Sequence, residues 1–444
     1  MTQALPGFAR TAAAAALCLL GMLAAQAGRA GEAPVPAFPG AVGFGVETPG
    51  GRGGPVVRVT TLLDAGPGSL RAALEGRSDP RMVVFAVGGT IALEREIAVG
   101  GNVTVLGQTA PAPGVTLTGA RLKVVGGDVI LRGLRVRPGG ALPGQALGQR
   151  DGISVGGPDS TVRRVVVAQN SISWATDENL ATWNAVEDVT FARNIVAEAL
   201  NEAGHPEGAH SMGMLVGPRS RRVSIVQNVF ASNRWRNPQI RGLAEGEVVN
   251  NVVHNYGPGA LSVGGGATRI DVVGNLFSAG PDTPDPFTRA PIHIAGKAPD
   301  GLYHVEGNLM PMVPDTVRGD GPDRLSAEPV AGRAALSAFS AYDLPGALTD
   351  RVGARLPAVD PIDRRILDDV LRGRGAVVDA PPADVGTAVA AAGQGADQGA
   401  DRDGDLIPDA WELRIGSDPD RPDAGALAPT GYAFVEAYVD ALDP

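Results

Sequence analysis

The chain has 444 residues, a net charge of −10 and an aromatic content of 4%. An acidic chain lacks the basic footprint that duplex nucleic acid requires, so we expect no nucleic acid partner. Glycine (62) and proline (36) are abundant, which favours many turns and short strands over a helical bundle. An acidic polymer is compatible with this charge only where cationic side chains or a bridging metal offset it.

Residues 1–30 have the pattern of a secretory signal peptide, because Arg10 precedes an apolar run and small residues follow it. A membrane anchor is the alternative, although the run is short for a bilayer span. The single cysteine, Cys18, lies inside this run, so the processed protein would have no disulfide. We expect a secreted or periplasmic monomer that does not bind a membrane after signal cleavage.

A glycine-rich segment, residues 38–54, precedes an expected strand at 56–60 and a short helix that begins after Ser69. Serine is a good N-cap residue, and apolar side chains follow it on one face. We expect residues 38–74 to cap the open end of the domain that follows. A phosphate-binding glycine loop is the alternative, but no GKS, GKT or GxGxxG pattern is present.

A repeat follows this segment. Short apolar runs occur at 83–85, 103–105, 115–117 and 129–131. Asparagines then recur 24, 34, 23, 24 and 33 residues apart, at Asn170, Asn194, Asn228, Asn251, Asn275 and Asn308. Such a period predicts a stacked solenoid made of short strands, a parallel β-helix, over residues 31–312.

The asparagines themselves are expected to be structural, stacked into a ladder at one turn of every coil. The two longer spacings indicate loops inserted at 198–220 and 278–300. We expect the functional site beside these insertions.

The repeat is lost after residue 312. Apolar residues at helical spacing over 362–371 predict a helix within an extension, 313–383, that packs on the solenoid. Residues 384–400 are mostly Ala, Gly, Gln and Asp and are typical of a flexible linker.

The last segment, residues 401–444, begins with an acidic twelve-residue loop. Its oxygen ligands occupy positions 1, 3, 5, 9 and 12 of the EF-hand pattern, at Asp401, Asp403, Asp405, Asp409 and Glu412. Leu406 stands where glycine normally allows the sharp turn. We expect one structural Ca²⁺ ion here; an acidic turn without metal is the alternative.

A second acidic group combines Asp151 with Asp177 and Glu178, about one coil further along the chain. Stacking would place these carboxylates side by side, where they repel each other unless a cation lies between them. Hard oxygen ligands in an exported protein favour Ca²⁺. The alternative is a set of exposed acids at loop tips.

Two histidines, His205 and His210, lie in the first insertion. A zinc site is disfavoured, because Pro206 and Gly208 interrupt any helix that would aim both rings at one ion. Substrate contact or packing within the loop is the preferred interpretation.

Arginines flank a proline in Arg236-Asn-Pro-Gln-Ile-Arg241. Because proline fixes its own φ and guanidinium groups suit carboxylates, the segment predicts a stiff cationic grip. A solvated turn with surface arginines is the alternative when the segment is considered alone.

These motifs together resemble the pectate lyase family, in particular its bacterial branch. The resemblance covers residues 38–312. It is carried by the FPGA-GFG, GGRGG and GPGSLR segments of 38–71 and by the R-x-P-x-x-R motif at 236–241.

The resemblance implies a right-handed parallel β-helix and Ca²⁺-dependent β-elimination on polygalacturonate, an acidic polysaccharide. It further implies that Asp151, Asp177 and Glu178 bind Ca²⁺. Arg236 would remove the C5 proton, and Arg241 would hold a uronate carboxylate.

Three departures from the family pattern leave alternatives open. Ala168-Gln169-Asn170 replaces an Asp-His-Cys run, Ala181 replaces an acid, and a lysine common near 211–214 is missing. A non-catalytic pectin-binding β-helix protein is one alternative. A polygalacturonase-like hydrolase, which would need paired acids, is the other.

Overall fold

The computed structural model describes residues 35–139, 148, 150–157, 161–242, 244–284, 289–295, 300–311, 313, 316–319, 322–331, 339–382 and 399–442. The expected signal peptide (1–30) and residues 384–398 of the expected linker lie outside these described residues. No helix in the described ranges is long and apolar enough to cross a membrane.

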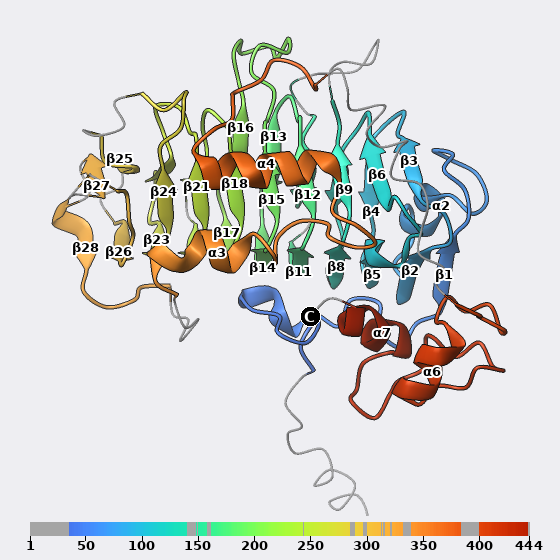
Figure 1. The fold of residues 1–444 in the computed structure, drawn as a ribbon. Coiled ribbons are helices and arrows are strands. Elements are labelled where there is room, and N and C mark those ends of the chain that lie inside the picture. Colours follow the sequence, from blue (N-terminus) through green and yellow to red (C-terminus); the bar gives the residue numbers. More distant parts are fainter. Residues whose placement is uncertain are drawn as a thin grey trace, which may run out of the picture. The chain divides into compact units, whose positions relative to one another are not determined.

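Three parallel sheets, A, B and C, build the fold, and the chain visits them in turn (Figure 1). Sheet A contains β1 (Val56–Val59), β2 (Arg81–Phe85), β5 (Val103–Leu106), β8 (Val129–Arg132), β11 (Val162–Ala168), β14 (Val186–Ala192), β17 (Ser220–Val226), β20 (Glu245–Val249), β23 (Arg269–Val273), β26 (Leu302–Glu306) and β28 (Leu325–Ser326).

The other two sheets follow the same stacking order. Sheet B contains β3 (Gly89–Ala92), β6 (Val115–Thr118), β9 (Arg135–Arg137), β12 (Ser171–Ser173), β15 (Ile195–Ala197), β18 (Val229–Ala231), β21 (Val252–His254) and β24 (Leu276–Ser278). Sheet C contains β4 (Ile97–Val99), β7 (Leu122–Val124), β10 (Ile153–Val155), β13 (Glu178–Thr182), β16 (Met212–Val216), β19 (Gln239–Arg241), β22 (Leu261–Gly264), β25 (Ile292–Ala295) and β27 (Val317–Gly319). The predicted parallel β-helix is confirmed.

The core consists of columns of apolar side chains that stack from coil to coil. In sheet A the strand register places Leu131, Val167, Phe191, Ile225 and Val248 in one such column. All five are buried. Because every second residue of a strand faces inward, short apolar runs suffice to fill this narrow interior.

The six asparagines form the predicted ladder. The main-chain N–H of each donates to Oδ1 of the next, over 2.8–3.0 Å, in the order Asn170, Asn194, Asn228, Asn251, Asn275 and Asn308. The residue before each asparagine has a positive φ between 54° and 62°. The side chains therefore satisfy buried amides at a turn where the backbone ladder is interrupted.

Replacing a ladder residue tests this role. Asn228 is fully buried and accepts from Asn194, whereas Asn308 at the end of the ladder is half-buried. We expect Asn228→Ala to lower the free energy of unfolding by about 2–3 kcal/mol, since it leaves buried donors unpaired. Asn308→Ala should lower the free energy of unfolding clearly less, because water can replace the lost side-chain amide. Equal losses in urea unfolding would contradict the ladder as the cause.

The N-terminal segment only partly forms the expected cap. Helix α2 (Leu70–Leu74) begins at Ser69, whose hydroxyl accepts from the Ala72 amide over 3.2 Å. Leu70 and Leu74 are buried in the solenoid core beside the first strands. This part of the segment covers the end of the solenoid as expected.

Residues 37–47, which include the 3-10 helix η1 (Phe44–Glu47), do not cap the end. They cross the outer face of sheet A, where the Gly45 amide donates to Thr190 Oγ1 and the Phe44 amide donates to Ser224 Oγ, each over 2.9 Å. A Cβ added at Gly43 would lie 2.3 Å from Thr190 Oγ1. The glycines thus allow close backbone contact with the sheet, and the expectation of a cap was wrong for this part.

The predicted C-terminal helix is present as α4 (Pro361–Arg372), preceded by α3 (Leu344–Leu348). Apolar residues of both helices pack against side chains of sheet B, among them Ile195 and Val229. Buried Arg137 of β9 forms ion pairs with Asp360 and Asp363, the latter at 2.8 Å. Apolar burial and paired charges thus hold the helix on the sheet.

Residues 401–442 contain α6 (Asp409–Ile415) and α7 (Phe434–Leu442). Phe434 and Val439 pack with Met82 and Val84 of β2, near the N-terminal end of sheet A (Figure 1). Ion pairs join Arg52 to Glu436 at 2.8 Å and Arg132 to Asp440 at 2.7 Å. The remaining short helices are η2 (Gly107–Thr109), η4 (Pro322–Arg324) and η5 (Ala341–Asp343).

Candidate active site

A cleft of about 440 Å³ lies on the outward face of sheet C, over β7, β10, β13, β16 and β19. It is lined by all seven groove residues that the sequence singles out: Asp151, Asp177, Glu178, His205, His210, Arg236 and Arg241. The stacking of coils brings them together from positions up to 90 residues apart (241 − 151).

The three acids sit where β10 and β13 begin. Ile153 pairs with Leu180 in the register, which places Asp151 beside Glu178. Carboxylate oxygens of Asp151, Asp177 and Glu178 lie within 4.8 Å of one another. Burial raises the pKa of Asp151 to about 6; Arg121 opposes this shift and Asp177 adds to it. Crowded, partly buried carboxylates are a donor set that fits a hard divalent cation.

Each acid also has a basic partner. Arg121 Nη1 lies 2.6 Å from Asp151 Oδ2, Arg236 Nη1 contacts Glu178 Oε1, and His210 Nε2 lies 3.1 Å from Asp177 Oδ1. Arg121 also binds Glu96 at 2.7 Å. No motif marks Arg121 in the sequence; the signal that could have found it is its position about one coil before Asp151. The cleft therefore holds a near-balanced set of buried charges.

The Arg121–Asp151 pair leads to a pH-dependent prediction. Since burial raises the pKa of Asp151 above its unfolded value, ionising this carboxyl costs stability as pH rises through about 6. Removing Arg121 raises this pKa further and leaves an unpaired buried charge. In metal-free buffer, Arg121→Met should be near wild type in urea unfolding at pH 5 and clearly less stable at pH 8.

The double variant Arg121→Met/Asp151→Asn is the control for this prediction. It has no carboxylate to ionise, so it should lose most of the added pH dependence. A destabilisation of Arg121→Met that is the same at both pH values would show that packing, not charge, is responsible.

The arginine motif connects β18 to β19. Asn233 and Asn237 are buried and bonded to each other at 3.1 Å, and the peptide between Asn237 and Pro238 is cis. Arg236 has a φ of 58°, and its carbonyl accepts from the Met214 amide of β16 over 2.5 Å. This anchored turn directs Arg236 into the cleft. Burial lowers the pKa of Arg236, Asp177 opposes this shift, and Arg241 adds to it.

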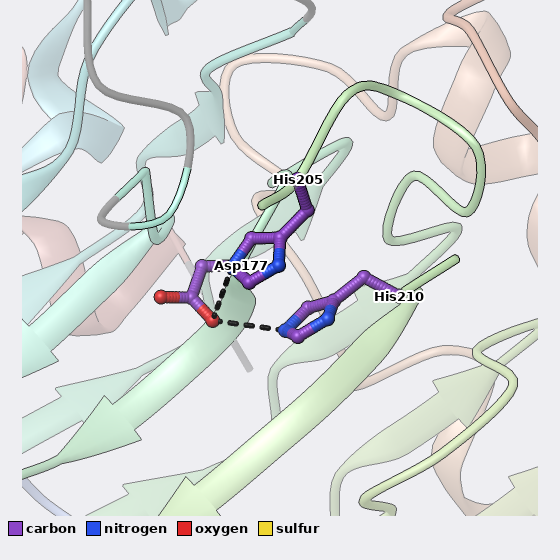
Figure 2. Close-up of side chains that lie close together, drawn as sticks. All are labelled: Asp177, His205 and His210. Atoms are coloured by element: carbon purple, nitrogen blue, oxygen red, sulfur yellow. Dashed lines mark hydrogen bonds and ion pairs between the residues drawn. The ribbon is translucent and has the colours of Figure 1, made fainter. Parts of the chain in front are cut away.

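The two histidines lie together over Asp177 (Figure 2). Their rings stack with centroids 3.6 Å apart, and Nε2 of His205 and of His210 lie 3.8 Å and 3.1 Å from Asp177 Oδ1. A turn closed by Gly208 N–H to His205 O, 2.9 Å, brings them together. Residues 201–210 contain no helix, as expected, but this turn still aims both rings at one carboxylate.

Hydrogen bonding assigns a role to these rings. His205 Nδ1 accepts from the Glu207 amide over 3.1 Å, so the proton of the neutral ring is on Nε2, facing Asp177. Burial, and next His210, lower the pKa of His205. A protonated Nε2 suits a donor to a carboxylate better than a ligand to zinc. His210 Nε2 lies within hydrogen-bond distance of Asp177 and His205 stacks on the His210 ring, so the pair positions Asp177 at the edge of the cleft.

Of the two insertions, only the first borders the cleft among the described residues. The loop 198–211 supplies both histidines, whereas no lining residue comes from 278–284, 289–295 or 300. Lys123, Ser154 and Trp183 also line the cleft, although no motif marks them in the sequence. Their signal was the alternation of inward- and outward-facing residues along sheet C, which can be assigned only when the register is known.

The C-terminal acids form two adjoining clusters. One contains Asp401, Asp403 and Asp405, and the other contains Asp405, Glu412 and Asp423. Burial and the neighbouring acids, Asp403 first, raise the pKa of Glu412 to about 7.

Two residues of this loop differ from expectation. Asp409 lies outside both clusters and pairs with Arg402 at 2.8 Å, so its expected place as a ligand is not supported by the geometry. Asp423 lies beyond the twelve-residue pattern and was missed. Leu406 adopts a φ of 79° where the pattern has glycine.

The fold and cleft define a parallel β-helix protein with a charged surface groove, and comparison with known proteins agrees. No protein-family model matches the chain. A probable pectate lyase C of Aspergillus flavus is 34% identical over 421 residues, covering 92% of this chain and 94% of the relative. The corresponding protein of Emericella nidulans is 33% identical over 425 residues, covering 92% and 93%.

Solved structures share the fold. Jun a 1, the major allergen from cedar pollen, superposes with a TM-score of 0.55 at 20% identity, covering 70% of this chain and 92% of its own. A pectate lyase from Bacillus sp. N165 in complex with trigalacturonate gives 0.50 at 16% identity, covering 71% and 98%. With the relatives above, these findings show that the chain belongs to the pectate lyase family.

Proposed function

We propose that the protein is a secreted, Ca²⁺-dependent pectate lyase that cleaves polygalacturonate by β-elimination. The observation that carries the proposal is one cleft that contains three clustered carboxylates together with both arginines of the R-x-P-x-x-R motif. Secretion is supported by the signal-like residues 1–30.

Asp151, Asp177 and Glu178 would hold the ion, since their oxygens lie within 4.8 Å of one another and carboxylates are the ligands Ca²⁺ prefers. When bound, Ca²⁺ supplies positive charge that neutralises the uronate carboxylate and makes the adjacent C5 proton more acidic. The two histidines keep Asp177 in place for this role.

Arg236 is the group that removes the C5 proton. Arginine is a weak candidate for a base in water, but burial lowers the pKa of Arg236. Its contact with Glu178 opposes deprotonation, so Arg236 must exchange Glu178 for substrate before it acts. Arg241 lies in the same cleft and holds a carboxylate of the substrate, which stabilises the enolate-like intermediate. The C4–C5 double bond then forms as the C4–O bond breaks, and the departing oxygen takes a proton from solvent.

The elimination assay tests this proposal. Wild-type protein, polygalacturonate and Ca²⁺ at alkaline pH should yield unsaturated uronides, seen as ultraviolet absorbance, and a chelator should abolish the signal. Arg236→Lys keeps the charge but loses the guanidinium, so we expect kcat to fall by about 10²- to 10³-fold. Arg221→Lys is the matched control, because Arg221 is 62% exposed and lies on sheet A.

The outcomes separate the candidate functions. Substantial activity in Arg236→Lys would contradict the assigned base. New reducing ends without absorbance would indicate a hydrolase, and binding of polygalacturonate without any product would indicate a non-catalytic protein.

We also propose one structural Ca²⁺ ion in the C-terminal loop, held by Asp401, Asp403, Asp405, Glu412 and Asp423. Calorimetric titration of an Asp177→Asn background isolates this site from the cleft. There, Asp405→Asn, which affects both clusters, should weaken Ca²⁺ binding at least tenfold. Asp409→Ala should change it little, since Asp409 pairs with Arg402. A larger loss of Ca²⁺ affinity in Asp409→Ala than in Asp405→Asn would indicate that Asp409 is a ligand.

A further inference from the structure

A depression about the width of one strand crosses the cleft over β10, between β7 and β13. The register pairs Ser154 of β10 with Lys123 of β7 on one side and Ala181 of β13 on the other. Gly156, two residues after Ser154, lies on the same face and also lines the cleft. Because adjacent strands are about 4.8 Å apart, the side chains flanking β10 are about 10 Å apart. Small residues thus leave room for a sugar ring between β7 and β13.

Trp183, directly after β13, forms one side of this depression. It is 47% exposed, although most large apolar side chains are buried. A Cβ added at Gly217 would lie 2.7 Å from Trp183 Cε3, so the indole rests on that glycine. The three atoms nearest to an added Cβ at Gly156 include no indole atom. The ring therefore leans toward Gly217, which follows β16 on the opposite side of β13 from β10.

Lys123 forms the other side. Arg121, Arg236 and both histidines of the cleft have acidic partners. Lys123 and Arg241, by contrast, form no ion pair with any residue in the described ranges, although both line the cleft. Lys123 is also one of only two lysines in the chain. Unpaired cations beside buried acids are suited to bind an anionic ligand.

We propose that Trp183 and Lys123 form a subsite for one uronate residue, on the β7 side of the residue held by Arg241 of β19. The apolar C–H face of the pyranose ring packs on the indole, and its carboxylate pairs with the Lys123 ammonium. This inference rests on the proposed function and adds to it a preference for non-esterified sugar at this position. Lys123 determines the preference, since packing on Trp183 requires no charge.

Kinetics test the two residues separately. Trp183→Ala should raise KM for polygalacturonate about tenfold while kcat changes less than about threefold, and Trp183→Phe should retain most of the affinity. Lys123→Met should raise KM for polygalacturonate and leave KM for highly methyl-esterified pectin nearly unchanged. Tyr342→Ala is the control, because Tyr342 is 77% exposed and does not line the cleft.

Binding tests the subsite without turnover. On an Arg236→Lys background with Ca²⁺ present, calorimetry with hexagalacturonate should show weaker binding for Trp183→Ala and Lys123→Met. Their effects should be less than additive, since both contact one sugar. If both variants bind hexagalacturonate as tightly as Arg236→Lys alone, the subsite is overturned. A wild-type protein that makes no unsaturated product would overturn the proposed lyase function and leave this titration valid.

Discussion

The register of the stacked coils is the constraint on which the rest of the structure depends. Every coil must place its strands about 4.8 Å above the last, with inward side chains in columns. The asparagine ladder helps to fix this register, because each side chain satisfies the backbone amide of its neighbour in a turn without strand hydrogen bonds. Once the register is fixed, Asp151, Glu178 and Arg236 must meet on the face of sheet C.

Charge balance is the second constraint. Carboxylates crowded on adjacent strands repel each other, and burial makes their ionised forms costly. Arg121, Arg236 and the histidine pair offset this cost in the protein alone. The same contacts hold Arg236 on Glu178, so assembling the cleft for chemistry means exchanging internal ion pairs for contacts with an ion and substrate.

The solenoid also needs its outer faces covered. All five residues of β2 are buried, on its outward as well as its inward face. Helix α7 packs on the outward face. Sheet B is covered by α4, which is held by Arg137 between Asp360 and Asp363. The segments outside the repeat are thus part of the hydrophobic structure and extend it beyond the inner core.

The sequence by itself determined the period, the strand type and the ladder, because these depend on local alternation and on residues that recur at fixed spacing. It also marked Arg236, Arg241 and the acids through short motifs. Only the tertiary structure decided which other side chains lie beside these residues. Arg121, Lys123 and Trp183 lie in or beside strands of sheet C without a motif, and Asp423 lies beyond the calcium-loop pattern. The course of residues 37–47 across sheet A and the stacking of His205 on His210 depend on turn geometry and contacts between distant coils. Such contacts follow from register, which no local pattern specifies.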